Sequence, residues 1–474
     1  MKHYPKTNYG EDATPGGLLA FLKDCRDQAK AEGRPQLVNI SLDVFHIDPL
    51  AVLEAVYEDQ NRHFFLENPL FDQTIAAIET VRAKTAWGPD RFGQIKAWAE
   101  RLLQRAIYTG NTGFPYCGIH FFCCFNFFDQ GQDLPGFPAA QAFVPLWQVS
   151  RKDQYSLAIA NCIIGENTSL EGVAGKILGA YGRFSTFPYK SPSPVERERA
   201  HWTSQGEVGE KGEFERSVEG ANRAIRNGQF EKVVLGRAID FRADGAVTPL
   251  AILDRLRNRF PTCHTFSFSA GREGTFLGAT PELLVSVKKG RLRAEALAGS
   301  VARGNSASED AALGLSLLNN SKDAHEHRVV VDGIVRRLRS LGLEPEAVDR
   351  PRLLKLANVQ HLLTPIQADL AKDIHILDVV RSLHPTPAVG GAPQGAACDA
   401  IQNYESFIRG PYAGPVGWFD AHGDGEFVVG IRSGILHRNT IRLFSGSGIV
   451  RGSTPQNEKL ETDLKFKAMR EVMD

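Results

Sequence analysis

Hydrophobic and polar positions alternate with a period of two along much of the second half of the chain. Such alternation is typical of strands with one buried face, and it covers residues 232–241, 262–270, 275–287, 290–300 and 412–450. These stretches follow one another through tight turns. Because consecutive strands joined in this way pair antiparallel, the pattern predicts an α+β fold with large, mostly antiparallel sheets.

Other stretches have the period of an amphipathic helix. They are residues 19–33, 213–229 and 321–342. In the last of them, one side carries Val329, Val330, Ile334 and Leu338, and Gly342 provides a stop signal. We expect these helices to flank the sheets.

A polar segment with several Pro and Ser residues, 187–212, predicts an exposed connection. We therefore place a boundary near residue 210, between an N-terminal α/β region (1–209) and a C-terminal region (210–474) packed with it into one compact unit. The most apolar run of the first region, Phe114–Phe128, contains Pro, Gly, His and Asn and predicts a buried strand or two.

Composition points to a globular protein with a small-molecule partner. The chain has 474 residues, 42% of them hydrophobic, which is enough for one large core or two fused ones. Lys plus Arg and Asp plus Glu are equal at 55 each, so no net field attracts nucleic acid or an anionic membrane. We therefore expect neither as a partner.

The first residues of the chain and the spacing of its cysteines favour a cytoplasmic protein. The first 17 residues lack the apolar segment of a secretory signal, and no apolar run reaches membrane-spanning length. The seven cysteines show neither CxxC nor a His-paired zinc spacing. We expect reduced thiols, with Cys123 and Cys124 on opposite faces of one strand.

Common cofactor and hydrolase motifs are missing. Gly446 and Gly448 begin a glycine pattern, but the third glycine of a dinucleotide fingerprint falls on Arg451. The sequence has no GxxxxGK[ST] loop and no GxSxG elbow. NAD binding and serine hydrolysis are therefore disfavoured.

Two ionisable residues lie in apolar strands. Lys232 opens "KVVL", where it either marks the solvent end of a strand or belongs to a site. Glu282 lies in "TPELL", where it is either a surface residue at a strand start or a partly desolvated carboxyl with a raised pKa, suited to donate a proton.

Carboxylates also gather on two predicted helices. Glu326 lies between two histidines in "DAHEHR", one turn after Asp323; because the histidines are two apart, they point to different helix faces and zinc is disfavoured relative to a hard cation. In "NEKLETDLK" (457–465), Glu458, Glu461 and Lys465 share one face. That face is either a solvated surface or part of a site.

The stretch "LHPTPAVGGAP" (383–393) is the most specific single signal. Three prolines and two glycines fix a rigid backbone around His384. The stretch is either a structural loop or the support of a site.

Taken in order, these residues resemble the chorismate-utilising enzyme family. The resemblance extends from Phe214 to Met473. It is carried by "KVVLGRA", "GATPELL", "ALAGSVARG", "SKDAHEHRVVVDGI", "LHPTPAVGGAP", "YAGPVGWFD", "GIRSG", "GSGIV" and "NEKLETDLK". It implies a sandwich-like core of antiparallel sheets flanked by helices, with catalysis in region 210–474. No functional residue is carried onto the N-terminal region.

The resemblance implies a magnesium enzyme acting on chorismate. Glu326 and Glu461 match the metal ligands, and Asp323 and Glu458 match carboxylates that support them. Lys465 would then act on the bound carboxylate or its water shell. Mg²⁺ keeps several waters and takes few carboxylates, so this small ligand set suits it.

The resemblance also implies the reaction. Lys232 matches the general base that activates a water for attack at ring carbon C2, and Glu282 matches the general acid that protonates the departing C4 hydroxyl. The remaining matches are to substrate-binding residues: Arg432 and Tyr412 at the enolpyruvyl carboxylate, Gly446 and Gly448 with backbone N–H groups at a carboxylate, and Gly299, Ser300 and His384 around the ring.

Within the family, three positions favour water over ammonia as the nucleophile. Lys232 is retained, Ala298 replaces the lysine nucleophile of aminodeoxychorismate-forming members, and Ala388 stands where amine-using members carry a hydroxyl. We therefore expect an isomerase that forms isochorismate for menaquinone or phylloquinone synthesis, without a redox cofactor or a glutaminase subunit. Salicylate formation, siderophore synthesis and a binding-only relative are the alternatives.

Overall fold

The computed structural model describes residues 2–3, 15–110, 114–130, 134–185, 200–357 and 359–473. Residues 4–14 of the amino-terminal stretch and residues 187–199 of the predicted connection lie outside the described residues. The helices are α1 (Pro15–Ala31), α2 (Pro49–Ala55), α3 (Arg91–Leu103), α4 (Leu170–Ser185), α5 (Glu213–Arg226), α6 (Pro249–Arg259), α7 (Ala307–Asn319), α8 (Ser321–Ser340), α9 (Ile376–Leu383), α10 (Gln394–Tyr404) and α11 (Pro455–Met473).

The larger sheet has 14 described strands. In spatial order they are β1 (Lys2–His3), β6 (Ile107–Gly110), β2 (Gln36–Val44), β10 (Tyr155–Ile164), β9 (Trp147–Lys152), β4 (Gln73–Ile78), β3 (His63–Asn68), β13 (His264–Ser269), β14 (Thr275–Thr280), β23 (Ser433–His437), β24 (Thr440–Val450), β12 (Lys232–Ala243) and β11 (Trp202–Glu207), with β20 (Gly391–Ala392) beside β12. Among these described pairings, only those of β6 with β1 and β2 are parallel.

The second sheet has ten described strands and is antiparallel where described. Its order is β17 (Glu346–Ala347), β19 (Val359–Asp369), β16 (Arg291–Ala302), β15 (Leu283–Lys288), β22 (Gly425–Val429), β21 (Pro415–Asp420), β7 (His120–Phe125), β8 (Ala140–Val144) and β5 (Arg82–Ala86), with β18 (Arg352–Lys355) beside β19. The predicted α+β class with mostly antiparallel sheets is confirmed.

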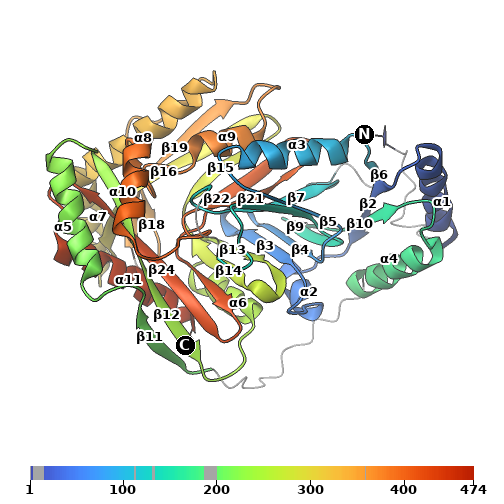
Figure 1. Ribbon diagram of the computed structural model, residues 1–474, viewed down its shortest axis with the longest axis horizontal. Helices are drawn as coiled ribbons and strands as arrows, with labels where there is room; N and C mark the ends of the chain where they lie inside the picture. The colour runs from blue at the N-terminus through green and yellow to red at the C-terminus, as the bar shows by residue number, and fades with distance from the viewer. Residues whose placement is uncertain are drawn as a thin grey trace.

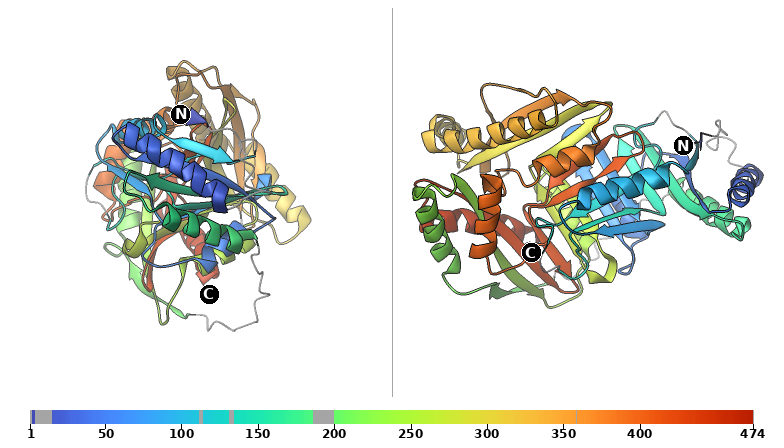
Figure 2. Two further views of the ribbon diagram at one scale, coloured as in Figure 1. Left: turned by 90° about the vertical axis from the view of Figure 1, so that its right-hand side faces the viewer. Right: turned by 45° about the horizontal axis from the view of Figure 1, so that its top comes forward.

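The two sheets face each other across a layer of aromatic side chains. This layer includes Phe64 and Phe266 of the larger sheet and Phe122 and Trp418 of the smaller one. Helices cover the outer faces: α8 packs on β16, α9 on β15, and α5 and α11 on β24. Figures 1 and 2 show α1 and α4 together at one end of the molecule, and Figure 1 shows α5 and α11 at the other end. The predicted sandwich-like core flanked by helices is therefore present.

Both sheets take strands from either side of residue 210. The link is direct, because β3 pairs with β13 over four residues. The division near residue 210 stays a prediction. Part of the segment predicted as an exposed connection is a strand, so that prediction is wrong for 202–207: β11 is an edge strand with outward-facing polar side chains, and such a strand lacks the apolar alternation that sequence reasoning needs.

The predicted buried strand in Phe114–Phe128 is β7, with Cys123 and Cys124 in different hydrophobic clusters on its two sides. All seven cysteines are free thiols. Over the described part of the chain, no helix combines the length and the apolar character needed to cross a membrane.

Candidate active site

A cavity of about 100 Å³ lies where β12 and β24 of the larger sheet meet α8, α11 and strand β16 of the smaller sheet. Twelve of the fifteen candidate site residues line it: Lys232, Glu282, Gly299, Ser300, Glu326, Ala388, Tyr412, Arg432, Gly446, Gly448, Glu461 and Lys465. These residues come from segments spread over more than 200 positions of the sequence. Their convergence on one cavity is what a shared site requires.

Lys232 is buried, so the interpretation that it marks the solvent end of a strand is wrong. It opens β12, which is paired on both sides, with Val450 of β24 and Ala392 of β20 as its neighbours. Its side chain is 1% exposed and its Nζ donates to Glu326 Oε1 at 2.8 Å. The strand therefore holds the ammonium group at the cavity wall.

Glu282 lies where the chain passes from one sheet to the other. Pro281 cannot donate a ladder hydrogen bond, and the predicted strand 275–287 divides there into β14 and β15. The Glu282 side chain is buried, so its interpretation as a surface residue is wrong. Burial raises the pKa of Glu282 to about 7, although the nearby Lys232 opposes that rise. Near pH 7 this carboxyl is thus able to give up a proton.

Both carboxylate-bearing helices, α8 and α11, contribute a glutamate to the cavity lining. Asn320 caps α8, its Oδ1 accepting from the backbone N–H of Lys322 and Asp323, which fixes the first turn. One turn on, Glu326 reaches the cavity. The zinc interpretation fails as expected: His325 is exposed, whereas His327 is buried with Nε2 2.8 Å from Thr364 Oγ1.

Helix α11 turns its charged face inward. Glu458 is buried and bonded by Ser447 Oγ, and Lys465 Nζ donates to Glu461 Oε1 at 2.7 Å and to Gly446 O at 2.8 Å. On the same helix Leu460 and Leu464 are 62% and 52% exposed. In the first half of α11 this reverses the ordinary amphipathic arrangement. Glu458 is buried, and Glu461 and Lys465 line the cavity although their side chains are 37% and 25% exposed, so the interpretation of this face as an ordinary solvated surface is wrong.

The carboxylates outnumber their lysine partners. Glu326 pairs with Lys232, Glu461 with Lys465, and Glu458 with Lys322 at 3.6 Å. Asp323 has no such partner among the described residues, and burial together with Glu326 and the other two carboxylates raises its pKa to about 6. In the described chain no three His, Cys, Asp or Glu side chains form a ready metal-ligand cluster. Two carboxylates, Glu326 and Glu461, reach the cavity, and the four carboxylates together carry one more negative charge than their three lysine partners neutralise. Such a set of oxygen donors suits a hydrated hard cation.

Arg432 brings an unpaired positive charge into the cavity. It is 8% exposed, its Nη1 is buried without a hydrogen-bond partner among the described residues, and burial lowers its pKa. Its backbone is in the left-handed region, with φ of 48°. A buried guanidinium without a carboxylate partner is costly unless an anion binds it.

His361, which sequence reasoning missed, orients this guanidinium. Arg432 Nη2 lies 2.9 Å from His361 Nε2, and because a guanidinium can only donate, Nε2 must accept. The proton then lies on Nδ1, which is 2.9 Å from Ser300 Oγ and 3.2 Å from Gly299 O. Burial and Arg432 lower the pKa of His361 to about 3, so the ring is neutral. The available signal was a histidine inside the apolar run "VQHLL".

The glycines leave space for a ligand. Gly299 has φ of 73° and lies at a bulge of β16, where the chain passes close to Asp323. A Cβ on Gly448 would lie 2.8 Å from Glu326 Oε1, and one on Gly446 would lie 2.7 Å from the Tyr412 hydroxyl oxygen. Tyr412 itself is stacked on Phe444. Side chains at these two glycines would fill the cavity.

The other three candidates lie outside the cavity lining. Asp323 lies one turn before Glu326 on α8, and Glu458 lies one turn before Glu461 on α11, as residues that support these two cavity carboxylates would. His384 is buried with Nε2 2.9 Å from Phe127 O, and its ring packs edge-on against Phe127 and Phe92. The structure therefore does not bring His384 to the cavity and gives it a structural role in its loop. From the same loop, Thr386 donates to Glu282 at 3.5 Å.

This cavity and fold are those of an enzyme class that binds chorismate. Residues 20–474 match the chorismate binding enzyme family, and the chain belongs to this family. The chain is 35% identical over 452 residues to the salicylate biosynthesis isochorismate synthase of Pseudomonas aeruginosa, covering 94% of this chain and 92% of that one. It is 31% identical over 452 residues to isochorismate synthase MenF of Bacillus subtilis, covering 93% and 94%.

A solved structure shows the same fold over nearly the whole chain. The menaquinone-specific isochorismate synthase MenF of Escherichia coli superposes with a TM-score of 0.75 at 25% identity, covering 93% of this chain and 95% of that one. The predicted family is confirmed, and so is the prediction that the chain is an enzyme.

Proposed function

We propose that the chain catalyses the reversible isomerisation of chorismate to isochorismate. One observation carries the proposal: Lys232 and Glu282 line the same cavity as a buried Arg432 whose Nη1 lacks a partner. An acid, a base and an anion site in one cavity suit proton transfer on a carboxylate substrate. The isochorismate synthases that match over more than nine-tenths of the chain support this reaction.

The substrate carries two carboxylates, and the cavity offers a separate place for each. Arg432, oriented by His361, provides directional donors for the enolpyruvyl carboxylate, with the Tyr412 hydroxyl beside it. The ring carboxylate would lie at the other side, near Lys465 and the backbone of Gly446 and Gly448. The ring then lies between Lys232 and Glu282.

The reaction exchanges one hydroxyl for another. For this exchange Lys232 must be the neutral amine, so it first gives up the ammonium proton that it donates to Glu326 in the structure. The amine then takes a proton from a water whose oxygen bonds to C2. The ring double bonds shift, the C4–O bond breaks, and Glu282 gives its proton to the departing hydroxyl, which leaves as water. One water enters and one leaves, so the product is an isomer and no redox cofactor is needed. In the reverse direction the two residues exchange roles.

We also propose that Mg²⁺ completes the site, held by Glu326 and Glu461 with Asp323 and Glu458 supporting them. The fit rests on the donor set described above: hard oxygen ligands carrying one more negative charge than the lysines neutralise. When bound, the ion would neutralise the ring carboxylate and draw electron density from the ring.

Glu461→Gln is expected to raise the Mg²⁺ concentration for half-maximal activity by tenfold or more, because it removes a charged ligand while keeping the shape of the side chain. The measurement is a Mg²⁺ titration of the rate at fixed chorismate. Glu471→Gln, on the exposed end of the same helix, is the matched control and should titrate like the parent protein. Coincident curves for Glu461→Gln and the parent would remove Glu461 from the metal site.

The product assay tests the function directly. Purified protein is incubated with chorismate and Mg²⁺, with and without ammonium, and the products are separated by chromatography. A mixture of chorismate and isochorismate, unaffected by ammonium and absent with EDTA, is expected. Salicylate with pyruvate would instead establish a salicylate synthase, an aminated product would overturn water as the nucleophile, and no product would indicate a binding-only relative.

For the pathway, we propose quinone biosynthesis, menaquinone or phylloquinone, in the cytoplasm. The likeness to a menaquinone-specific enzyme over 93% of the chain supports it. The relative named for salicylate biosynthesis matches equally far along the chain and supports a salicylate pathway instead. Quinone extracted from a deletion strain decides between them, since only the first pathway predicts its loss.

A further inference from the structure

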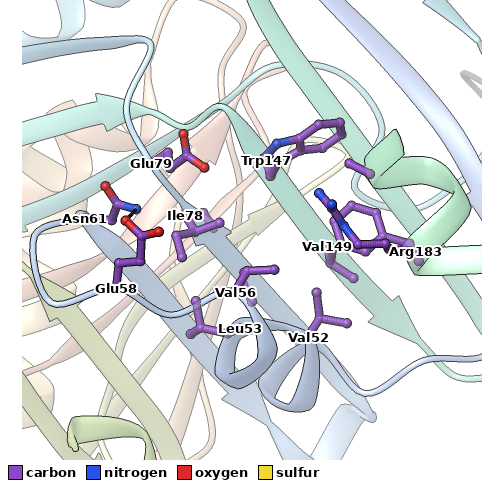
Figure 3. A pocket seen from close by; sticks show the side chains of 14 residues that line it. Val52, Leu53, Val56, Glu58, Asn61, Ile78, Glu79, Trp147, Val149 and Arg183 are labelled. Atoms are coloured by element: carbon purple, nitrogen blue, oxygen red, sulfur yellow. Dashed lines mark hydrogen bonds between the residues drawn. The ribbon is translucent and has the colours of Figure 1, made fainter. Parts of the chain in front are cut away.

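A second cavity, of about 280 Å³, shares no lining residue with the active-site cavity. It lies between α2 and α4, over strands β4 and β9 of the larger sheet (Figure 3). All its lining comes from region 1–209, onto which the family resemblance carries no functional residue. Nothing in the chorismate reaction accounts for it.

One part of this cavity is apolar. Val52 and Val56 from the α2 side face Ile78 and Val149 of the sheet across it, and the ring of Trp147 stands beside them (Figure 3). A cavity with such walls gives water few hydrogen-bond partners, so an apolar body gains by replacing it.

The other part is acidic, and the Asn61 amide there donates to Glu58 at 3.3 Å. Figure 3 places Glu58, Asn61 and Glu79 on one side of the cavity. Glu79 is half-buried, and among the described residues its carboxylate has neither a hydrogen bond nor an ion pair. Burial, and then Glu58, raise the pKa of Glu79. Its backbone is held at φ of 60°, in the left-handed region.

Cations near the cavity do not satisfy this carboxylate. Arg183 of α4 lines the cavity on the side of Val149, away from Glu79, and Lys176 lies outside the lining (Figure 3). Both side chains are exposed, and neither has a described ion pair with Glu79. A half-buried carboxylate next to an aromatic ring and an apolar wall is complementary to an ammonium group on an apolar body.

We propose that this cavity binds a small apolar amine, a protonated amino group on an aromatic or branched aliphatic body. The ammonium lies beside Glu79 and Glu58, and the body lies against Val56 and Trp147. A volume of about 280 Å³ limits the ligand to about a dozen non-hydrogen atoms. The site is independent of the proposed isomerase activity.

The test uses three probes of similar size: phenethylamine, its neutral analogue 2-phenylethanol and the anion phenylacetate. Binding to the full-length protein is measured by calorimetry and by the indole N–H signal of Trp147, assigned with Trp147→Phe. We expect saturable binding of phenethylamine, about tenfold weaker binding of 2-phenylethanol, and none of phenylacetate.

Two substitutions locate the binding. Glu79→Gln should weaken phenethylamine about tenfold and leave 2-phenylethanol within twofold, whereas Val56→Trp should remove both by filling the cavity. Glu171→Gln, an exposed acid on α4 outside the cavity, is the matched control and should change nothing.

No saturation with phenethylamine up to about 10 mM, equal affinity for the three probes, or an unchanged affinity in Glu79→Gln would each overturn the proposal. The Trp147 signal keeps the test decisive if Val56→Trp does not fold. No outcome depends on chorismate turnover, so failure here and failure of the proposed reaction are distinguishable.

Discussion

Lys232→Met lowers the rate of isochorismate formation by an expected 10²- to 10⁴-fold, about the contribution of a positioned general base. Methionine keeps the apolar stem of a side chain that is 1% exposed, so the strand β12 stays packed while the proton acceptor is lost. The anion site is untouched, and chorismate should still bind. The measurements are kcat from the product assay and Kd from calorimetry.

Lys459→Met is the matched control for that substitution. Lys459 lies on α11 and pairs with Asp463 away from the cavity, so the rate should stay within twofold of the parent. Wild-type turnover in Lys232→Met would exclude Lys232 as the base. Loss of chorismate binding with a native circular dichroism spectrum would instead make Lys232 a substrate-binding residue.

The regular elements that the sequence did predict were found because their periodicity is set by burial. The helices starting at Glu213 and Ser321 begin where their patterns do, and the alternation over 412–450 became four antiparallel strands. Half-buried strands and amphipathic helices must repeat with their own geometry, so a single sequence is enough to find them.

The site was predictable only through its resemblance to a family. Without that resemblance, Lys232 and the helix face that carries Glu461 could equally be interpreted as surface positions, because charged residues normally lie at the surface. On α11 the opposite holds: Glu458 is buried, Glu461 lines the cavity, and Leu460 faces solvent. No local pattern reveals such a reversal, because the groups that hold these side chains, such as Ser447 and Lys322 at Glu458, come from other parts of the chain.

The positions of the other site residues depend on pairing between strands that are far apart in the sequence. Glu282 reaches the cavity because the chain changes sheets at Pro281, and His361 because β19 pairs with β16 opposite the Gly299 bulge. Register between strands 60 residues apart is a property of the fold as a whole. His384, in the most specific motif, proved to be structural because its ring faces Phe127.

Glu282→Gln is the second substitution with a large expected effect, because glutamine keeps the volume and hydrogen-bonding capacity of the acid but has no proton to give. We expect a 10²- to 10⁴-fold loss of rate. In the parent protein the acid must be protonated, so kcat/KM should fall as the pH rises through about 7. In the variant, the residual kcat/KM should no longer fall as the pH rises through about 7.

The same substitution should stabilise the fold at high pH. Burial raises the pKa of Glu282 from 4.5 to about 7, so the folded state binds this proton more tightly than the unfolded state does. The free energy of unfolding therefore falls as the pH rises from about 4.5 to about 7, where only the unfolded state loses the proton readily. Removing the ionisable group therefore gains at most roughly 3 kcal/mol at pH 8 and nothing at pH 4. Thermal unfolding at the two pH values measures the difference.

Glu426→Gln separates catalysis from stability. Glu426 is buried like Glu282, and burial raises its pKa to about 7 as well, but it lies on β22 outside the cavity lining, with Asn68 Nδ2 donating to it at 3.4 Å. We expect the same rise in unfolding temperature at pH 8 with full activity. If both variants lose activity alike, the loss comes from removing a buried charge from the sheets, and Glu282 is not the acid. If only Glu282→Gln loses activity, the proton comes from Glu282.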